Sequence, residues 1–303
     1  MVFLIYPIHL FENIDEIIKS GEGKIVIIED PIYFSDWERK LIFNKKKLVF
    51  HRATMKVYYE YLKNNDNIKK NGISVKYVEW NNVSTKKKWL NIMKKMENIV
   101  CYDPVDKLLE ERLNNVFKNK NEKITLLESP QFITTRDDLN VFYNNQKQKG
   151  LKRIFNQTAF YKWQRERLNI LMTKSGKPIG GRLTFDIYNR GKLPEDVKIP
   201  ALPFQRGLSE DARYLREAEL YVNKLWKGNY GDSDGLIFPI SNDKSREWFD
   251  NFMKKRFLCF GEYQDAITDD NENINNPILF HSGISALHRP KRKMRQNHYN
   301  KTS

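Results

Sequence analysis

The sequence predicts an open, doubly wound α/β domain built on a parallel sheet, followed by a mainly helical region. Short apolar runs alternate with longer helical patterns along the first part of the chain, and this alternation is typical of a parallel sheet. After Phe132 the pattern changes, and the second half is mostly helical. A length of 303 residues allows two domains of ordinary size, each with its own core.

The expected strands are short and the expected helices amphipathic. One helix carries Leu48, Met55, Tyr59 and Leu62 near one face with lysines around them, as a helix packed on a sheet should. The ligand crevice of such a domain lies at the carboxyl ends of its strands. The expected strands are Val2–Tyr6, Lys24–Glu29, Ser74–Trp80, Ile99–Tyr102 and Ile124–Glu128, and further helices are expected over Phe11–Ser20, Lys86–Met96 and Val105–Asn119.

The second half opens on a helix start of the capping-box type, Thr135 with Asp138 three residues later. An irregular stretch rich in glycine, proline and basic residues covers Ser175–Gly207. The other expected helices are Thr158–Met172, Ser209–Trp226 and Asn242–Phe260. We therefore expect an α/β domain over 1–133, a linker with helices over 134–208, the start of a helical domain over 209–287 and a basic, disordered tail over 288–303.

Composition limits the class of protein. Lysine and arginine number 53 against 38 acidic residues, a net charge of +15 that suits a polyanionic partner such as nucleic acid or simply favours solubility. Cys101 and Cys259 are far apart, which indicates a reducing compartment and excludes a four-cysteine iron–sulfur cluster within this chain. The first apolar run is too short for a membrane span and lacks a basic leader, so we expect a soluble, intracellular protein without a membrane partner.

The ends of the first two strands carry the first candidate site. No glycine-rich phosphate loop follows the first strand, where Tyr6–His9 stands instead, and this disfavours ordinary dinucleotide or ATP binding. The second strand ends at Glu29–Pro31, whose acids either bind a polar ligand or cap a turn. The histidines His9, His51, His288 and His298 form no metal-binding or acid–base spacing, and we interpret them as ordinary residues.

Three segments in order carry a resemblance to a known family. GGRLTFDIYNRGKLP, residues 180–194, is similar to a Gly-Gly-Arg/Lys-Trp-Asn-Phe-Asp-x-x-Asn-Arg segment, with leucine and threonine in place of its Trp-Asn pair. FGEYQDAITDD at 260–270 and FHSGIS at 280–285 match a Phe-Gly-x-x-Gln-Asp-Ala run and a His-Ser-x-x-Ser element. The chain thus resembles the photolyase/cryptochrome superfamily, within it the deoxyribodipyrimidine photolyase-related family of the bacterial 6-4 type. Further matches are Tyr161, Arg165 and Met172, and at the front IVIIE and KKKLVFHRATMKVYYEYL.

The resemblance implies a Rossmann-like antenna domain followed by an all-α domain that holds FAD. Glu29 falls where an antenna-contacting glutamate is expected, the antenna often being a ribityl lumazine, although Pro7–Leu10 replaces the family's Gly-Asp-Gln-Leu segment. The alternative to flavin contacts is aromatic core packing for the second segment and a serine helix cap for the third. The residues expected to bind FAD are Phe260, Tyr263, His281, Ser282, Ile284 and Ser285.

The same resemblance implies a DNA contact in the glycine-rich linker. Arg182, Asn189 and Arg190 fall in a loop that in the family lies between the domains beside the DNA, where guanidinium groups hold phosphates. Salt bridges between the domains are the alternative use of these side chains.

Past Ser285 the chain departs from the family pattern. The family would continue with the rest of its flavin cradle, so the resemblance implies a truncated, incomplete flavin domain and no catalytic residue within this chain. Light-driven DNA repair is then expected only when a separately encoded C-terminal photolyase half supplies the rest. The alternatives are a non-catalytic protein that binds nucleic acid or a small molecule, and a degenerate product of a split gene.

Overall fold

The computed structural model describes residues 1–19, 23–118, 124–150, 156–194, 196–203, 212–268 and 276–287. The chain forms two compact units. The sheet unit comprises Met1–Ser129, Phe204–Trp248 and Ala286–Arg289, and the helical unit comprises Pro130–Pro203, Phe249–Ser285 and Pro290–Ser303. The expected disordered tail, 288–303, lies outside the described residues.

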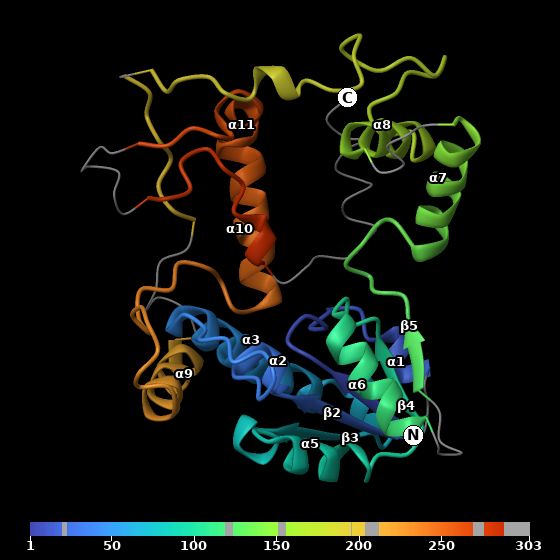
Figure 1. Ribbon diagram of the computed structural model, residues 1–303. Helices are drawn as coiled ribbons and strands as arrows, with labels where there is room; N and C mark the ends of the chain where they lie inside the picture. Colours follow the sequence, from blue (N-terminus) through green and yellow to red (C-terminus); the bar gives the residue numbers. More distant parts are fainter. Residues whose placement is uncertain are drawn as a thin grey trace. The chain divides into compact units, whose positions relative to one another are not determined.

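The sheet unit is built on five parallel strands, which confirms the predicted fold class (Figure 1). The strand order is β3-β2-β1-β4-β5, so the direction of winding reverses between β1 and β4. Val2 pairs with Lys24 on one side and with Ile99 on the other. The crevice expected at a reversal point of this kind lies at the carboxyl ends of β1 and β4. The strands are β1 (Val2–Ile5), β2 (Lys24–Ile28), β3 (Ser74–Val78), β4 (Ile99–Tyr102) and β5 (Ile124–Leu127).

Alternating side chains of each strand enter cores on opposite faces of the sheet. Ile5 of β1 belongs to a cluster that contains Leu48 of α3, whereas Leu4 belongs to a second cluster that contains Trp89 of α5 and Leu113 of α6. Successive strand side chains point to opposite faces, so both faces need a helical cover. The helices here are α1 (Asp15–Lys19), α2 (Pro31–Phe34), α3 (Lys45–Asn64), α4 (Asp66–Lys70), α5 (Lys86–Met93) and α6 (Lys107–Phe117), with a short 3₁₀ turn, η1, at Trp80–Asn82.

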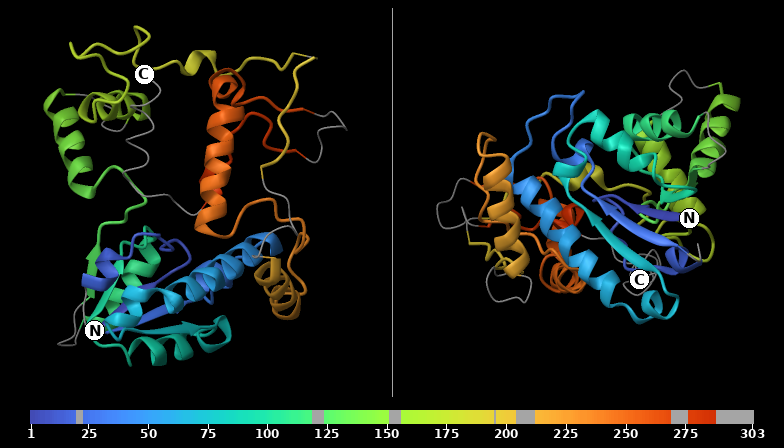
Figure 2. Two further views of the ribbon diagram at one scale, coloured as in Figure 1. Left: turned by 180° about the vertical axis from the view of Figure 1, so that it is seen from behind. Right: turned by 90° about the horizontal axis from the view of Figure 1, so that it is seen from below.

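Helix α9 (Ala212–Leu225) also belongs to the sheet unit. Its buried side chains Leu215, Ala218 and Val222 recur at helical spacing and join the same cluster as α3. Figure 2 shows α9 alongside α3 in two further views. The sequence placed this helix at the start of a separate helical domain, whereas the structure groups it with the sheet, because its apolar stripe packs on α3.

The helical unit contains α7 (Arg136–Gln148), α8 (Gln157–Arg167), η2 (Asp186–Tyr188) and α11 (Phe257–Tyr263). The predicted capping box at the start of α7 is confirmed: the Thr135 hydroxyl accepts from the Asp138 backbone N–H at 3.0 Å, and the Asp138 carboxylate accepts from that of Thr135 at 2.9 Å. Helix α10 (Asn242–Lys255) begins among residues of the sheet unit, and η4 covers Ile284–Ala286. No helix in the described part of the chain is both long and apolar enough to cross a membrane.

Candidate functional site

Glu29 follows β2 directly and is fully buried at the carboxyl edge of the sheet. Its Oε1 atom accepts hydrogen bonds from Arg52 Nη1 at 2.7 Å and from the Tyr77 hydroxyl at 2.6 Å. Its Oε2 atom accepts from the Trp80 backbone N–H at 2.8 Å and from the Tyr221 hydroxyl at 3.0 Å. A carboxylate offers about four lone-pair sites, and the chain's own donors engage as many. The expected contact between Glu29 and an antenna stays a prediction, and a ligand would have to replace one of these donors.

Arg52 of α3 is the counter-ion of Glu29 and is buried with it. Its guanidinium carbon lies 3.7 Å from the centre of the Tyr221 ring, and its Nη2 atom contacts Glu217 at 2.6 Å and Glu79 at 2.9 Å. Burial by itself lowers the pKa of Arg52, but the hydrogen bond to Glu217 and the charge of Glu29 raise it above its usual value. This arrangement ties α9 to α3 and to the ends of β2 and β3.

A second polar cluster lies at the ends of β1 and β2. Asp30 is fully buried, accepts from Trp89 Nε1 at 2.7 Å, and caps α2 by accepting from a backbone N–H. The rings of Tyr6 and His9 are 5.5 Å apart, and those of Tyr6 and Tyr33 are 6.3 Å apart. The Tyr6 hydroxyl, His9 Nδ1 and the Tyr33 hydroxyl are buried without a hydrogen-bond partner among the described residues. Buried polar atoms of this kind suit the polar edge of a ligand.

His9 lies at the carboxyl edge of the sheet, next to the end of β4. It is fully buried, and its Nε2 atom lies 3.2 Å from the carbonyl oxygen of Asp103, just beyond β4. Burial lowers the pKa of His9 to about 4, so the ring is neutral at pH 7. Burial raises the pKa of Asp30 to about 6, against the hydrogen bond from Trp89 that lowers it. The carboxyl ends of β1, β2 and β4 thus bring together two groups with opposite pKa shifts.

These two shifts predict opposite pH dependences of the free energy of unfolding. The unfolded chain binds a proton at His9 more tightly than the folded chain does. The contribution of His9 to the free energy of unfolding therefore grows by about 3 kcal/mol as the pH rises from about 4 to 6.5. Folded Asp30 holds its proton more tightly, so its contribution falls by about 3 kcal/mol as the pH rises from 3.8 to about 6. In the wild type the two slopes nearly cancel. Urea unfolding at several pH values tests this. Relative to wild type, the free energy of unfolding of His9→Phe should fall as the pH rises, and that of Asp30→Asn should increase as the pH rises. Slopes of the same sign in both variants would contradict this assignment.

The structure brings several of the predicted flavin residues together within the helical unit. The ring centres of Phe260 and His281 are 6.0 Å apart, and those of Tyr263 and Phe280 are 5.7 Å apart. Helix α11 therefore lies along the segment that contains His281. Ser282 is buried, whereas Ser285 is exposed and Ile284 is half-buried in η4. Contact of these residues with FAD stays a prediction.

Arg256, at the start of α11, was missed by the sequence analysis. Its guanidinium is buried and donates to the carbonyl oxygens of Pro200 and Ala201, both at 2.7 Å, and to that of Leu279 at 2.9 Å. It also donates to the Asn251 side chain at 2.8 Å. Burial lowers the pKa of Arg256. The sequence around it, MKKRFLCF, gives no sign that this cation is buried while the adjacent lysines are not.

The predicted DNA-binding residues lie in a loop that exposes aromatic and apolar side chains. Arg182 is exposed and donates to the Tyr188 hydroxyl at 2.9 Å, while Asn189 is buried and Arg190 exposed. The exposed fraction is 54% for Tyr188 and 74% for Ile187, so this part of the loop faces solvent. The arrangement suits an anionic partner with stacking bases, but the DNA contact stays a prediction.

Arg165 of α8 holds the start of this loop in place. It is buried, and its guanidinium donates to the carbonyl oxygens of Ile170, Leu171, Arg182 and Leu183 at 2.6 to 3.2 Å. Gly180 has φ +80° and faces Phe185, whose Cζ would lie 2.8 Å from an added Cβ, so the turn requires glycine. The Arg165 and Gly180 matches to the family pattern therefore have a structural reason.

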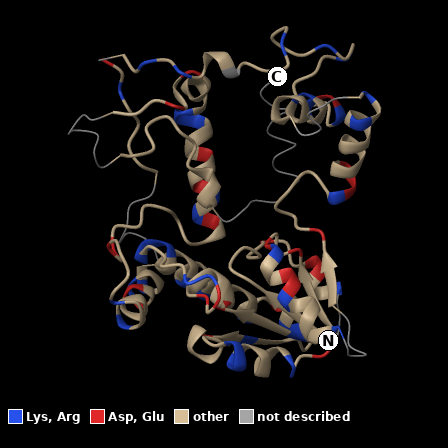
Figure 3. Ribbon diagram, in the orientation of Figure 1, with Lys and Arg blue, Asp and Glu red and all other residues tan. Residues whose placement is uncertain are grey.

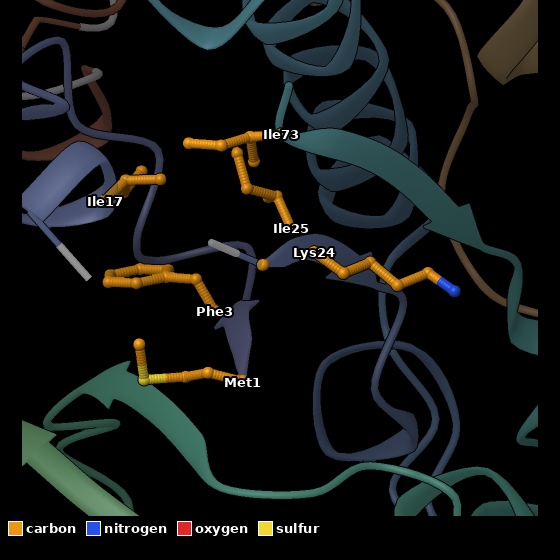
Figure 4. Close-up of a pocket in the computed structure, with 7 residues that line it drawn as sticks. Met1, Phe3, Ile17, Lys24, Ile25 and Ile73 are labelled. Carbon is orange, nitrogen blue, oxygen red and sulfur yellow. The ribbon is translucent and has the colours of Figure 1, made fainter. Parts of the chain in front are cut away.

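A small pocket lies at the amino ends of the strands, at the opposite edge of the sheet from Glu29 and Asp30 (Figure 4). Its lining is apolar except for Lys24, whose ammonium points away from the other side chains. It carries no candidate chemistry. Among the described residues no group of His, Cys, Asp or Glu side chains is arranged to hold a metal ion. The pocket is lined by Met1, Phe3, Ile17, Gly23, Lys24, Ile25 and Ile73.

Two relatives match parts of the chain. An uncharacterized protein of Acanthamoeba polyphaga mimivirus is 41% identical over 175 residues, which cover 57% of this chain and 85% of the viral protein. A (6-4) photolyase of Agrobacterium fabrum is 29% identical over 121 residues, which cover 40% of this chain and 23% of the photolyase. The match to the photolyase thus spans about a quarter of that enzyme's length.

The family comparison covers more of the chain than either relative. The sequence model of the deoxyribodipyrimidine photo-lyase-related protein family matches residues 3–238. This span contains the parallel sheet, the Arg182 loop and α9, so it includes both the polar clusters of the sheet unit and the predicted DNA-binding loop. The chain belongs to the deoxyribodipyrimidine photo-lyase-related protein family.

Proposed function

We propose that this chain takes part in light-driven DNA repair as the antenna-type domain and linker of a photolyase-related flavoprotein. The observation that carries the proposal is the family match over residues 3–238, which spans the sheet unit and the arginine loop together. The similarity to a (6-4) photolyase adds the class of lesion. The matched segment covers 23% of that enzyme, so the test below provides the rest of the enzyme as a second polypeptide.

Each candidate cluster has a part in this function. FAD, when bound, supplies the electron that drives the repair of the lesion. Phe260 and His281 offer ring edges that can pack against a flat, aromatic cofactor, and the buried Ser282 follows His281 in sequence. Arg182 and Arg190 hold DNA phosphates.

The second polar cluster is the better place for an antenna such as a ribityl lumazine. Tyr6, His9 and Tyr33 each offer a buried polar atom without a partner among the described residues, whereas both oxygens of Glu29 are engaged by the chain's own donors. A polyhydroxylated chromophore has the donors and acceptors to satisfy these atoms. We therefore assign the antenna to this cluster and give Glu29 the role of fixing Arg52.

Complementation tests the proposal directly. The chain is co-expressed with the part of the Agrobacterium (6-4) photolyase that follows its matched segment, and the complex is purified. We expect flavin absorbance and light-dependent loss of (6-4) photoproducts from DNA, with neither in either chain alone. Phe260→Ala should lower flavin retention by roughly two- to tenfold, because an aromatic contact contributes about 0.5–1.5 kcal/mol. Leu258→Ala on the same helix, where the side chain is 95% exposed, is the matched control. A complex that forms but neither binds flavin nor repairs the lesion would contradict the proposal.

The second candidate function is DNA binding without photochemistry. The exposed Arg182 and Tyr188 pair favours it, since a guanidinium and an exposed ring together suit phosphate and base. The chain alone, in the dark, would then bind DNA with an affinity that falls steeply as the salt concentration rises.

A further inference from the structure

A basic surface marks the carboxyl edge of the sheet unit. Lys45–Lys47 form the first turn of α3 and Lys86–Lys88 form the first turn of α5. Lys47 and all of Lys86–Lys88 are exposed, and Lys45 and Lys46 are half-buried. Figure 3 shows basic residues at these two helix starts. We call these six residues the lysine edge.

The fold places both triplets at the same edge. Each helix follows a strand of a parallel sheet and runs back antiparallel to it, so both helices start beyond the carboxyl ends of the strands. α3 is fixed against this edge by Lys56, whose ammonium contacts Glu79 just beyond β3 at 3.5 Å. Lys45–Lys47 lie some three turns before Lys56, and therefore project past the sheet.

The lysine edge has no acidic partners in the described part of the chain. None of the six ammonium groups forms a salt bridge there. Glu79 pairs with Arg52 and Asp106 with Arg39. Asp232 and Asp234 lie in the loop that contacts the start of α3, but they form no salt bridge with these lysines. The Lys47 ammonium lies 4.1 Å from the centre of the Phe43 ring. Partial burial of this ammonium group and the nearby charge of Arg39 lower the pKa of Lys47. The Lys88 ammonium contacts only a neutral group, the carbonyl oxygen of Asn81 at 2.8 Å.

Lysines in these positions cost stability in the isolated chain. The start of a helix carries partial positive charge, and α7 accordingly has Asp137 and Asp138 in its first turn. α3 and α5 have no acid in theirs. The repulsion is relieved when a polyanion lies along the edge, because both the ammonium groups and the helix ends then face negative charge.

We propose that the lysine edge is a second DNA-binding surface, on the sheet unit, that holds the phosphate backbone through Lys45–Lys47 and Lys86–Lys88. The identity of the polyanion as DNA rests on the proposed function, while the surface itself rests on the placement and unpaired charge of its lysines. Among the residues that the structure describes, the exposed apolar side chains beside these triplets are Leu41, Ile42 and Tyr230. Separate cations with little apolar surface between them suit a phosphate backbone better than a lipid surface.

The test measures DNA binding by the full chain in the dark, which keeps it separate from flavin loading and repair. Fluorescence anisotropy with a labelled duplex gives the affinity as a function of salt concentration. The edge variant combines Lys45→Gln, Lys46→Gln and Lys47→Gln and should bind DNA roughly tenfold more weakly or worse. The slope of the logarithm of the binding constant against the logarithm of the salt concentration should become shallower by about 0.9 for each phosphate that the variant no longer neutralises. The matched control neutralises three exposed lysines near the opposite edge, Lys63→Gln, Lys69→Gln and Lys70→Gln.

Each outcome decides the proposal. A large loss of affinity in the edge variant with a small one in the control supports it, and the same loss in Lys86→Gln, Lys87→Gln and Lys88→Gln extends it to α5. Equal losses in edge and control variants show a general charge effect and overturn it. So does unchanged binding in both edge variants, or binding of the wild type to anionic phospholipid vesicles but not to duplex DNA. Failure of the complementation experiment alone leaves these readouts unaffected, so the two proposals fail separately.

Discussion

Replacing Arg52 by leucine should reduce the free energy of unfolding of the sheet unit by about 3–5 kcal/mol. The change leaves the fully buried carboxylate of Glu29 without its counter-ion and removes the cation that stacks on Tyr221. An unpaired buried charge is among the costliest defects in a protein core. Urea unfolding followed by tryptophan fluorescence measures the effect, since Trp80 and Trp226 lie in this unit with their ring centres 4.9 Å apart.

The matched control is Glu217→Gln, which removes another carboxylate partner of the same guanidinium. The side chain of Glu217 is 44% exposed, so the expected loss of stability is below about 1 kcal/mol. Similar losses in the two variants would show that Arg52 acts as a surface ion pair and not as the buried partner of Glu29. The chain has two compact units, which can unfold separately. The transition followed by fluorescence is therefore compared with the loss of the helical circular dichroism signal before a free energy of unfolding is assigned.

Replacing Arg256 by methionine should be the second large effect, about 3 kcal/mol in the helical unit. Methionine fills similar volume, but the carbonyl oxygens of Pro200, Ala201 and Leu279 lose a charged donor. Since Leu279 immediately precedes the predicted flavin segment, we also expect lower flavin retention in the complemented protein. Limited proteolysis should show new cleavage near residues 200–201 and 279.

The control for this variant is Arg167→Met, on α8 of the same unit. Arg167 pairs with Asp138, and the side chains are 26% and 24% exposed, so its replacement should change stability by less than about 1 kcal/mol. Equal protease sensitivity in both variants would show that Arg256 does not organise the segments it contacts.

The sheet could be predicted from the sequence because its signal is local. Apolar runs such as Ile99–Tyr102 agree with the observed strands to within about two residues, and the capping box at Thr135 is correct in detail. The placement of α9 could not be predicted. An apolar stripe indicates that one face of a helix is buried, but it does not identify the element against which that face packs. The same holds for Arg52, which the sequence shows as one more basic residue of α3 although it is buried.

The acids at the end of β2 lie at the carboxyl edge of the sheet, as the sequence indicated, and ligand binding there stays a prediction. Glu29 is engaged internally, while Asp30 lies with polar atoms that have no hydrogen-bond partner in the described part of the chain. No sequence pattern marks His9, because its neighbours in the fold come from other elements. Asp103, for example, lies 94 residues further along the chain. Contacts between elements so distant in sequence leave no spacing to detect.

The hydrogen bond between Glu29 and Tyr221 spans 192 positions of the chain, and this bears on how the protein is made. A ribosome that has synthesised all five strands has not yet synthesised α9, so the nascent sheet exposes the apolar side of α3 that α9 will cover. At synthesis rates of about 5–20 residues per second, the delay is on the order of ten seconds. During that interval the partial sheet is open to proteases and to chaperones, and variants that weaken α9 should lower the yield of native protein in cells more than their equilibrium stability suggests.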